Sequence, residues 1–335
     1  MSDLAAARKP EPRGGGASAS TVKGVVAMAA AMGLFVTNDT FLKLAMREIP
    51  LGEALGLRSF AAGLLLLALI VRAGDLAALP HALRGRVLVR SALDTLTTFV
   101  YVAALAAMPI ASTTTIYMAA PLITTALAVP MLGEKVGWRS WCAITIGFLG
   151  AVIVTRPDPS TFSAIAVLPL LAAFFGSVRD IATRGIGMET PGPVVGFSGT
   201  LVLCLAGGIF MLWEDWRVPS LEVSAYLLAA GLAFAGGTVA LVFAFRNAPV
   251  ASVSPLRYLL VFGALVSGFF VFGDLPDAWT TVGMVLVVGA GLYALHREHL
   301  RSRAARLAAR NAAAGGGLGV SAPCSPVAAC APPHD

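Results

Sequence analysis

The chain has 335 residues, of which 57% are hydrophobic and only 13% are charged, and its mean hydropathy is +0.82. Soluble domains carry about 25% charged residues, so this composition disfavours a soluble enzyme. The hydropathy and the four cysteines also exclude a disordered or disulfide-stapled chain. The net charge of +6 has no basic and aromatic patch behind it, so we expect no nucleic-acid partner. An integral membrane protein remains.

Ten apolar stretches follow one another along the chain, and a helix of roughly 20 residues is long enough to cross the hydrocarbon core of a bilayer. Their hydrophobic residues run continuously instead of alternating, which favours helices over the strands of a membrane barrel. The stretches cover residues 24–45, 54–71, 87–107, 111–132, 141–155, 164–183, 193–213, 224–245, 251–272 and 278–295. The sequence therefore predicts an all-α integral membrane protein with ten transmembrane helices.

Lysine and arginine are distributed unevenly between the two sides of these stretches. One side holds the arm before residue 24, the connection between the second and third stretches, and the segment after residue 295. The other side offers only Lys43, Arg47, Arg156 and Arg217. Because basic connections stay cytoplasmic, we expect both termini in the cytoplasm. The membrane that we expect is the bacterial inner membrane. All five tryptophans fall at predicted stretch ends, where amphipathic rings prefer the membrane interface.

The second half of the chain repeats the first at an offset of 140–141 positions. Residues 108–112 (MPIAS) fall on residues 248–252 (APVAS), and Asp39 falls on Asp180. Each copy contains five stretches, an odd number, so the second copy enters the membrane from the opposite side. Such an inverted repeat is characteristic of secondary transporters with a central site between the halves.

A family resemblance is carried by residues 108–157 (MPIASTTTIYMAAPLITTALAVPMLGEKVGWRSWCAITIGFLGAVIVTRP) and 248–295 (APVASVSPLRYLLVFGALVSGFFVFGDLPDAWTTVGMVLVVGAGLYAL). These segments resemble the paired EamA modules of the drug/metabolite transporter superfamily, and the resemblance covers roughly residues 24–295. It implies ten helices as two inverted five-helix repeats. It also implies transport of small metabolites such as amino acids, nucleotide-like cofactors, riboflavin or drugs, and no catalytic signature.

The repeat and the composition together predict the organisation of the chain. We expect a cytoplasmic N-terminal arm at 1–23, a first five-helix repeat at 24–155, a connecting loop at 156–163, a second five-helix repeat at 164–295, and a cytoplasmic tail at 296–335. The tail is rich in Ala, Gly and Pro, so we expect it to be disordered.

Ionisable side chains inside the apolar stretches are costly, so they usually face a cavity or a partner. Asp39 and Lys43 lie one helical turn apart and can pair, and Asp180 and Arg184 repeat this spacing. Depth in the membrane separates the candidates into two groups. We expect an outer cluster of Asp39, Lys43 and Arg58, and an inner cluster of Asp94, Arg179, Asp180 and Arg257. Pairing on one side while the other side opens would give alternating access.

Less specific roles are open for some of these groups. Lys43 and Arg184 lie near stretch ends and can extend toward the interface. Arg58 and Arg257 can form static pairs that fix helix packing. For the three aspartates, which lie deeper, a functional role is favoured.

Neutral polar side chains complete the expected substrate cavity. Tyrosines can hydrogen-bond to a substrate and stack on a flat one, whereas ordinary helix–helix hydrogen bonding is the alternative for a threonine. The candidates are Asn38, Thr97, Tyr101, Tyr117 and Tyr258. Pro121 lies in the middle of the fourth stretch, where it permits a kink.

Two other function classes compete with a carrier. Residues 196–199 (GFSG) resemble the Gly-x-Ser-Gly of rhomboid intramembrane proteases, but none of the four histidines that could serve as the base lies in the body of a stretch. We therefore interpret this motif as a packing face. A passive channel would share the stretches and the polar lining, but inverted repeats with charged clusters favour alternating access.

The sequence therefore predicts a secondary transporter of a small organic metabolite. The mixed charges suit an amino acid-like zwitterion or a polar heterocycle such as a cofactor or vitamin. The alternatives are a passive channel and, less favoured, an intramembrane serine protease. The expected partners are the substrate and the lipid bilayer, with a homodimer left open. We expect no enzymatic activity, no cofactor and no metal.

Overall fold

The computed structural model of the chain describes residues 16–132, 138–155, 164–184, 190–247 and 254–293, together with His296 and Leu300. Regular structure in these residues is entirely helical, with no strand. They lie, up to Leu295, in one compact unit. The connecting loop at 156–163 falls outside the described residues, as do most of the predicted tail and the beginning of the N-terminal arm.

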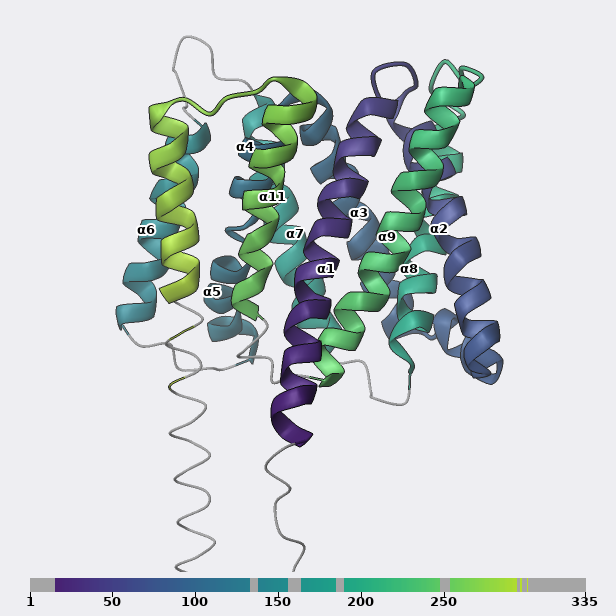
Figure 1. Cartoon of the computed structure of the whole chain (residues 1–335), viewed down its shortest axis with the longest axis horizontal. Helices are drawn as coiled ribbons and strands as arrows, with labels where there is room; N and C mark the ends of the chain where they lie inside the picture. The colour runs from purple at the N-terminus through teal and green to yellow at the C-terminus, as the bar shows by residue number, and fades with distance from the viewer. Residues whose placement is uncertain are drawn as a thin grey trace, which may run out of the picture. The chain divides into compact units, whose positions relative to one another are not determined.

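The helices stand side by side and roughly parallel to one another in Figure 1. The first part of the chain forms α1 (Gly16–Ala45), α2 (Leu51–Ala73), η1 (Asp75–Leu83), α3 (Gly85–Ala107), α4 (Ile110–Tyr117), α5 (Ala120–Leu132) and α6 (Trp138–Thr155). The second part forms η2 (Ala164–Val167), α7 (Leu168–Arg184), α8 (Gly192–Phe210), α9 (Leu221–Asn247), η3 (Ser254–Tyr258), α11 (Leu259–Ser267), η4 (Gly268–Phe272) and a final apolar helix, Ala278–Tyr293. α1 begins at Gly16, within the expected arm.

Five of the described helices are long and apolar enough to cross a membrane. They cover Val22–Ala45, Leu51–Ala73, Gly85–Ala107, Gly192–Phe210 and Leu221–Ala244. Shorter apolar helices cover Ile110–Thr124, Trp141–Val154, Leu256–Phe272 and Ala278–Tyr293. An all-helical fold with several membrane-spanning helices, as the composition predicted, is therefore found in the described residues. The count of ten crossings stays a prediction.

The fourth apolar stretch is interrupted in the place where a kink was expected. α4 ends at Tyr117 and α5 begins at Ala120, immediately before Pro121. A proline ring clashes with the carbonyl group four residues earlier, which here belongs to Tyr117, so a continuous helix is unfavourable. The described part of the ninth stretch, from Ser254 onward, is also irregular, because it begins with the 3₁₀ helix η3 and ends in the π turn η4 before Gly273, whose φ is +71°.

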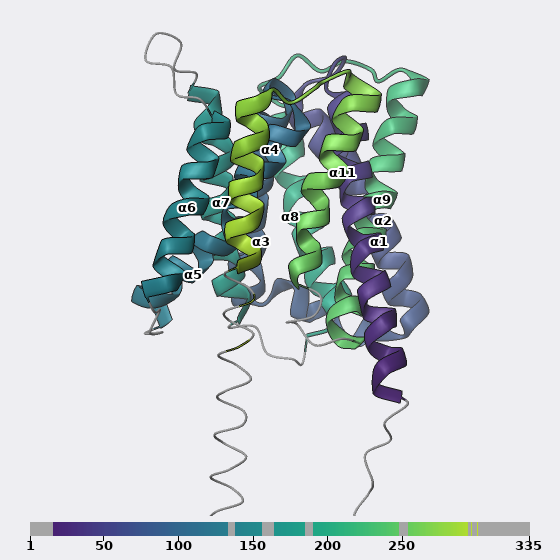
Figure 2. The same ribbon diagram turned by 60° about the vertical axis from the view of Figure 1, so that its left-hand side comes forward.

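Each of the main helix pairs joins the first part of the chain to the second. α1 packs on α9, α3 on α7, α2 on α8, and α4 on α11. α6 and the final helix lie side by side, as Figures 1 and 2 both show, and a Cβ atom added to Gly150 would lie 2.8 Å from Leu286 Cβ. The two parts are therefore interleaved within one bundle, and small residues allow their helices to approach closely.

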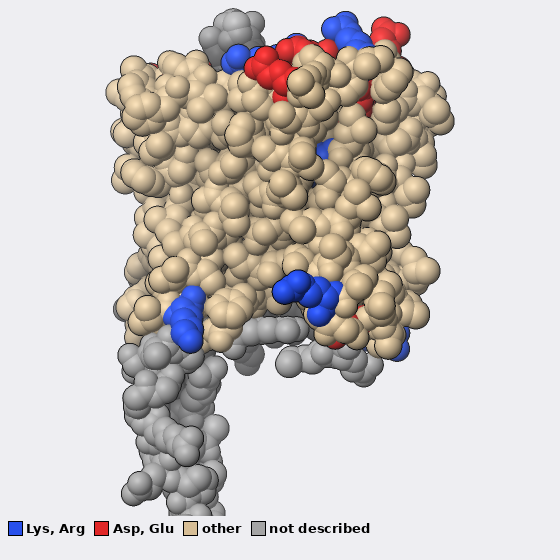
Figure 3. Space-filling model, turned by 45° about the vertical axis from the view of Figure 1, so that its right-hand side comes forward, with Lys and Arg blue, Asp and Glu red and all other residues tan. Residues whose placement is uncertain are grey.

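Two ends of the bundle can be defined from its connections. At the Ala45 end, α1 finishes and α2 begins, and Glu214 of the α8–α9 connection contacts Gly52 there. At the opposite end, the Gly85 end, η1 links α2 to α3. Charged side chains gather near these two ends, and the surface between them is almost uncharged in the view of Figure 3. The five tryptophans are 46–76% exposed, as expected for rings that anchor helix ends in a membrane.

Candidate functional site

Two clusters of polar side chains lie between the apolar helices of the bundle. The Arg58 cluster comprises Asn38 and Asp39 on α1, Arg58 on α2, Tyr101 on α3 and Thr114 on α4. The Arg179 cluster comprises Arg90 and Asp94 on α3 with Arg179 and Asp180 on α7. With a helical rise of 1.5 Å per residue, Asp39 lies about 9 Å from the Ala45 end of α1, and Arg179 lies about 8 Å from the last residue of α7. The clusters are thus displaced toward opposite ends of the bundle.

The Arg58 cluster is a continuous chain of hydrogen bonds. Arg58 Nη1 donates to Asn38 Oδ1 at 3.0 Å, and Asn38 Nδ2 donates to Asp39 Oδ1 at 2.8 Å. Tyr101 Oη donates to Asp39 Oδ2 at 2.8 Å and lies 3.2 Å from Thr114 Oγ1. The exposed fractions of Asn38, Asp39 and Arg58 are 4%, 9% and 1%. The Asn38 amide therefore stands between a buried cation and a buried carboxyl group, which do not touch directly.

Lys43 does not join this cluster. Its ammonium group donates to the carbonyl oxygen of Met108, the residue that follows the last turn of α3, and lies 5.2 Å from the ring centroid of Phe272. A cation at a helix C-terminus is favourable because the last carbonyl groups carry partial negative charge. The pair expected between Asp39 and Lys43 from their spacing is not formed, since each side chain has a different partner.

The Arg179 cluster is held together by ion pairs. Arg179 Nη1 lies 2.6 Å from Asp94 Oδ1, and Arg179 Nη2 lies 2.9 Å from Asp180 Oδ1. Asp94 Oδ2 also lies 3.4 Å from Arg90 Nη1. Arg179 therefore bridges one carboxylate on its own helix and one on α3. Because α3 and α7 come from different parts of the chain, the Arg179–Asp94 pair ties the two parts together inside the bundle.

Tyr117 and Thr97 lie in the region between the clusters. The ring centroids of Tyr101 and Tyr117 are 5.0 Å apart. A Cβ atom added to Gly176, one turn before Asp180 on α7, would lie 3.1 Å from Tyr117 Oη and 3.5 Å from Thr97 Cγ2. The Thr97 hydroxyl donates to the Leu93 carbonyl within its own helix at 2.7 Å, which is the local bond common for helical threonines. Tyr117, at the end of the interrupted α4, thus reaches from Tyr101 toward α7.

Arg257 and Tyr258 are not brought into the clusters. No ion pair joins Arg257 to Asp94 or Asp180 among the side chains that the structure describes, although an inner cluster containing Arg257 was expected. Tyr258 is 6% exposed, and its ring packs against Gly291 of the final helix. The side chain of Arg184 lies outside the described residues, so its expected pairing with Asp180 stays a prediction.

Three contacting residues escaped the sequence analysis. Arg90 precedes Asp94 by one helical turn, a spacing that indicates a pair. The hydroxyl of Thr114 approaches Tyr101. Phe234 on α9 places its ring centroid 4.4 Å from Arg58 Cζ, a contact that depends on how α9 packs against α2.

The Gly-x-Ser-Gly sequence of α8 serves as a packing face. Ser198 Oγ donates to the Ala82 carbonyl at 2.8 Å and accepts from Ser91 Oγ at 3.0 Å. A Cβ atom added to Gly199 would lie 3.1 Å from Asp94 Oδ2, so only a glycine admits the carboxylate here without displacement. Both hydrogen bonds of Ser198 hold α8 against η1 and α3, an arrangement that suits helix packing.

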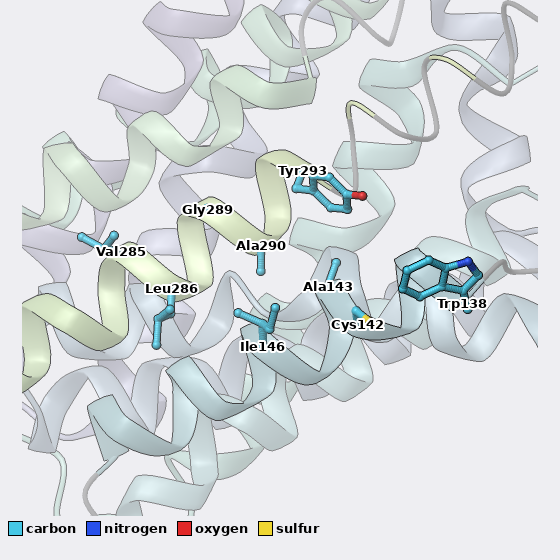
Figure 4. Close-up of a pocket in the computed structure, with 9 residues that line it drawn as sticks. All are labelled: Trp138, Cys142, Ala143, Ile146, Val285, Leu286, Gly289, Ala290 and Tyr293. Carbon is cyan, nitrogen blue, oxygen red and sulfur yellow. The ribbon is translucent and has the colours of Figure 1, made fainter.

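An apolar cavity of about 440 Å³ lies elsewhere, between α6 and the final helix (Figure 4). It is lined by Trp138, Cys142, Ala143, Ile146, Val285, Leu286, Gly289, Ala290 and Tyr293. None of the twelve predicted site residues lines it. We therefore place the candidate site at the two polar clusters and not at this cavity.

Comparison with known proteins identifies similar transporters. A model described as the EamA-like transporter family matches residues 22–156. A riboflavin transporter of Rhizobium johnstonii is 31% identical over 219 residues, which cover 65% of this chain and 72% of that protein. An S-adenosylmethionine uptake transporter of Rickettsia prowazekii is 26% identical over 269 residues, covering 78% and 88%. A pseudopaline exporter of Pseudomonas aeruginosa is 29% identical over 270 residues, covering 80% and 94%.

The overall fold also has a counterpart among solved structures. One crystal structure aligns with a TM-score of 0.57 at 21% sequence identity, over 83% of this chain and 97% of that chain. At this identity the likeness concerns the fold alone. The structural alignment and the two longer sequence alignments each cover more residues than either part of the chain contains. The similarity therefore extends over both parts.

Proposed function

The chain belongs to the EamA-like transporter family of the drug/metabolite transporter superfamily, and from this premise we propose that it carries a small organic metabolite across the bacterial inner membrane by alternating access. The family and the names of the relatives indicate a multi-pass membrane transporter rather than an enzyme. The relatives are named for riboflavin, S-adenosylmethionine and pseudopaline, and for uptake as well as export. These names support a substrate in the size range of a small metabolite.

We further propose that residues 24–155 and 164–295 are two inverted repeats of five transmembrane helices. Recurrence of helix boundaries at the offset of 140–141 supports this. α2 and α8 begin at residues 51 and 192, α3 and α9 end at 107 and 247, and α6 and the final helix begin at 138 and 278. These are the same offsets that relate the two halves of the sequence.

The helix packing supports the same symmetry. Exchange of the two halves turns the pair of α1 with α9 into the pair of α7 with α3, and both pairs are found. The pair of α2 with α8 and the pair of α4 with α11 each map onto themselves, and both are found as well. An arrangement of this kind places the substrate path between two related halves.

The positive-inside rule supports an orientation in which the Gly85 end and both termini face the cytoplasm. In that orientation the Arg58 cluster lies toward the outside and the Arg179 cluster toward the inside. The inner ion pair between Arg179 and Asp94 then holds the halves together on the cytoplasmic side. This partly buried pair across the halves is the observation that carries the proposal, because a carrier needs a tie that can be broken on one side at a time.

Metabolite profiling of cells and medium tests the proposal. Cells express the parent, the variant Asp94→Asn, or the control Asp215→Asn, which alters an exposed acidic residue in the α8–α9 connection. We expect one metabolite to shift between cytosol and medium with the parent and the control, and to shift at least tenfold less with Asp94→Asn. An equal shift with Asp94→Asn would leave transport standing and remove the role of the ion pair.

A second measurement separates a carrier from a passive channel. The shifted metabolite is loaded into proteoliposomes that contain the purified protein, and its efflux is followed with and without the same metabolite outside. A carrier gives a saturable rate that external metabolite accelerates by exchange. A rate that rises linearly with concentration and does not respond to external metabolite would replace the carrier with a channel.

A further inference from the structure

Arg58 is the largest side chain that is fully buried in the described residues, and its charge is incompletely partnered. Nη1 donates to Asn38, Nη2 has only a 3.5 Å contact with Ser59 Oγ, and Nε has no partner among the described atoms. No carboxylate oxygen in the described residues lies within 4.0 Å of the guanidinium group, whereas Arg179 contacts two carboxylates. A buried cation normally has a paired anion, because its lost hydration must be replaced.

The unpartnered edge of this guanidinium has a defined chemistry. Nε and Nη2 present their N–H groups side by side, and this edge can hold the two oxygens of one carboxylate in parallel hydrogen bonds. The third nitrogen, Nη1, is already fixed by Asn38. Asn38 therefore orients the guanidinium group, while its Nε–Nη2 edge has no carboxylate partner among the described residues.

The proposed repeat explains why no protein carboxylate occupies that edge. At the repeat offsets, Asp94 corresponds to Phe234 and Gly199 corresponds to Arg58. The contact of Gly199 with Asp94 between α8 and α3 thus has its counterpart in the contact of Arg58 with Phe234 between α2 and α9. One half carries a carboxylate at this position, where it pairs with Arg179, and the other half carries a phenyl ring.

Phe234 covers the guanidinium in the present state. Its ring centroid lies 4.4 Å from Arg58 Cζ, a distance that gives a favourable cation–π contact. The close approach of α9 depends on Gly231, where an added Cβ atom would lie 2.8 Å from the Arg58 carbonyl oxygen. α9 belongs to the second half and Arg58 to the first, so separation of the halves at the Ala45 end would lift the ring and uncover the cation.

We propose that Arg58 binds a carboxylate group of the transported metabolite, which supplies the carboxylate that the other half has in Asp94 and that this half lacks because Phe234 stands at the corresponding position. The inference rests on the proposed transport function and specifies its substrate class. The substrate is a carboxylate-bearing metabolite, entering from the Ala45 end when Phe234 moves with α9. The side-chain amide of Asn38 links Arg58 to Asp39. An ammonium group of the same substrate would therefore face Asp39.

Ligand-dependent thermal stability tests binding separately from transport. The purified full-length protein is heated with succinate, with each of the twenty protein amino acids, and with the carboxamide of every compound that stabilises it. We expect at least one carboxylate to raise the unfolding temperature of the parent and its carboxamide to have no effect. If no carboxylate in this panel stabilises the parent, or if the carboxamide stabilises it equally, the proposal is overturned.

Variants of the two contacting residues locate the site. Arg58→Gln is expected to weaken carboxylate binding about tenfold or more, while Arg72→Gln, an exposed arginine of the same helix, leaves it unchanged. Because Arg58→Gln can fail to fold, Phe234→Asp provides a second test. This variant supplies the missing carboxylate within the protein and is expected to fold and to lose substrate-carboxylate binding, while the uncharged control Phe234→Asn retains it. Equal binding by the two Phe234 variants would overturn the proposal.

Different results would overturn the transport proposal and the proposed role of Arg58. If the parent exports or imports a metabolite that lacks a carboxylate and Arg58→Gln moves it equally well, transport stands and the role of Arg58 falls. If carboxylates bind in an Arg58-dependent manner but no metabolite moves in cells or proteoliposomes, the binding site stands and the transport proposal falls.

Discussion

The carboxylate of Glu214 accepts the backbone N–H of Gly52 with both of its oxygens, at 3.0 and 2.9 Å. Gly52 lies in the first turn of α2, whose own N-cap residue, Pro50, offers no side-chain hydrogen bond. A residue from the α8–α9 connection therefore caps a helix from the other half of the chain. Its negative charge also faces the positive end of the helix dipole.

Loss of this cap is expected to destabilise the protein. Replacing a capping side chain by alanine typically costs about 0.5–2 kcal/mol, so Glu214→Ala should lower the free energy of unfolding by about 1 kcal/mol. The neighbouring exposed residue Asp215 provides a matched control, since Asp215→Ala removes one acidic group without removing the cap. Thermal unfolding in detergent measures both. Equal midpoints for the two variants would show that the cap contributes nothing.

The sequence predicted the helical membrane fold, because hydropathy follows directly from the order of residues along the chain. It did not predict which charges pair. Asp39 and Lys43 have the spacing of a helical ion pair, but Tyr101 comes to Asp39 from α3 and Lys43 finds the Met108 carbonyl. Partners that are more than 60 residues apart depend on how α1 packs against α3, which local periodicity does not encode.

The counterpart of Asp94 in the second half can be found from the sequence. The offset that matches Asp39 with Asp180 also matches Asp94 with Phe234, and this substitution of a ring for a carboxylate is visible without a structure. Its meaning depends on the contact of Phe234 with Arg58, which only the arrangement of α2 and α9 reveals.

Tyr101 provides a test of the Arg58 cluster. Tyr101→Phe removes the hydroxyl that donates to Asp39 at 2.8 Å and keeps the ring beside Tyr117. Hydrogen bonds to charged groups contribute about 1.5–3 kcal/mol, so we expect a loss of stability of that order and slower transport. The control is Tyr226→Phe, which removes a hydrogen bond to the exposed Glu222. Chemical unfolding and the proteoliposome assay provide the two readouts, and matching behaviour of the two variants would contradict a special role for the buried bond.

The tie between the halves can be measured by a double-mutant cycle. Asp94→Asn leaves Arg179 paired with Asp180, Arg179→Gln leaves Asp94 beside Arg90, and the double variant removes both charges of the pair. Directly contacting residues show coupling free energies of about 0.5–3 kcal/mol, and we expect a value within this range. Unfolding free energies of the parent, the two single variants and the double variant give the coupling. Additivity within about 0.5 kcal/mol would mean that the pair does not hold α3 to α7.

The close contact of α2 with α8 provides a test of the packing between the halves. A Cβ atom added to Gly207 would lie 2.7 Å from the backbone nitrogen of Gly56, while one added to Gly208 would meet nothing within 4 Å. Backbone atoms cannot give way as a side chain can, so Gly207→Ala must push the helices apart. We expect it to cost about 1–3 kcal/mol of stability, the range found for overpacked sites.

Gly208→Ala is the control on the adjacent residue of the same helix. Alanine has the higher helix propensity, by about 1 kcal/mol relative to glycine, so this variant should be neutral or more stable. The two substitutions add the same methyl group and therefore differ only in the surface that receives it. A loss of stability in both would assign the effect to α8 itself, whereas a loss in Gly207→Ala alone would assign it to the approach of α2.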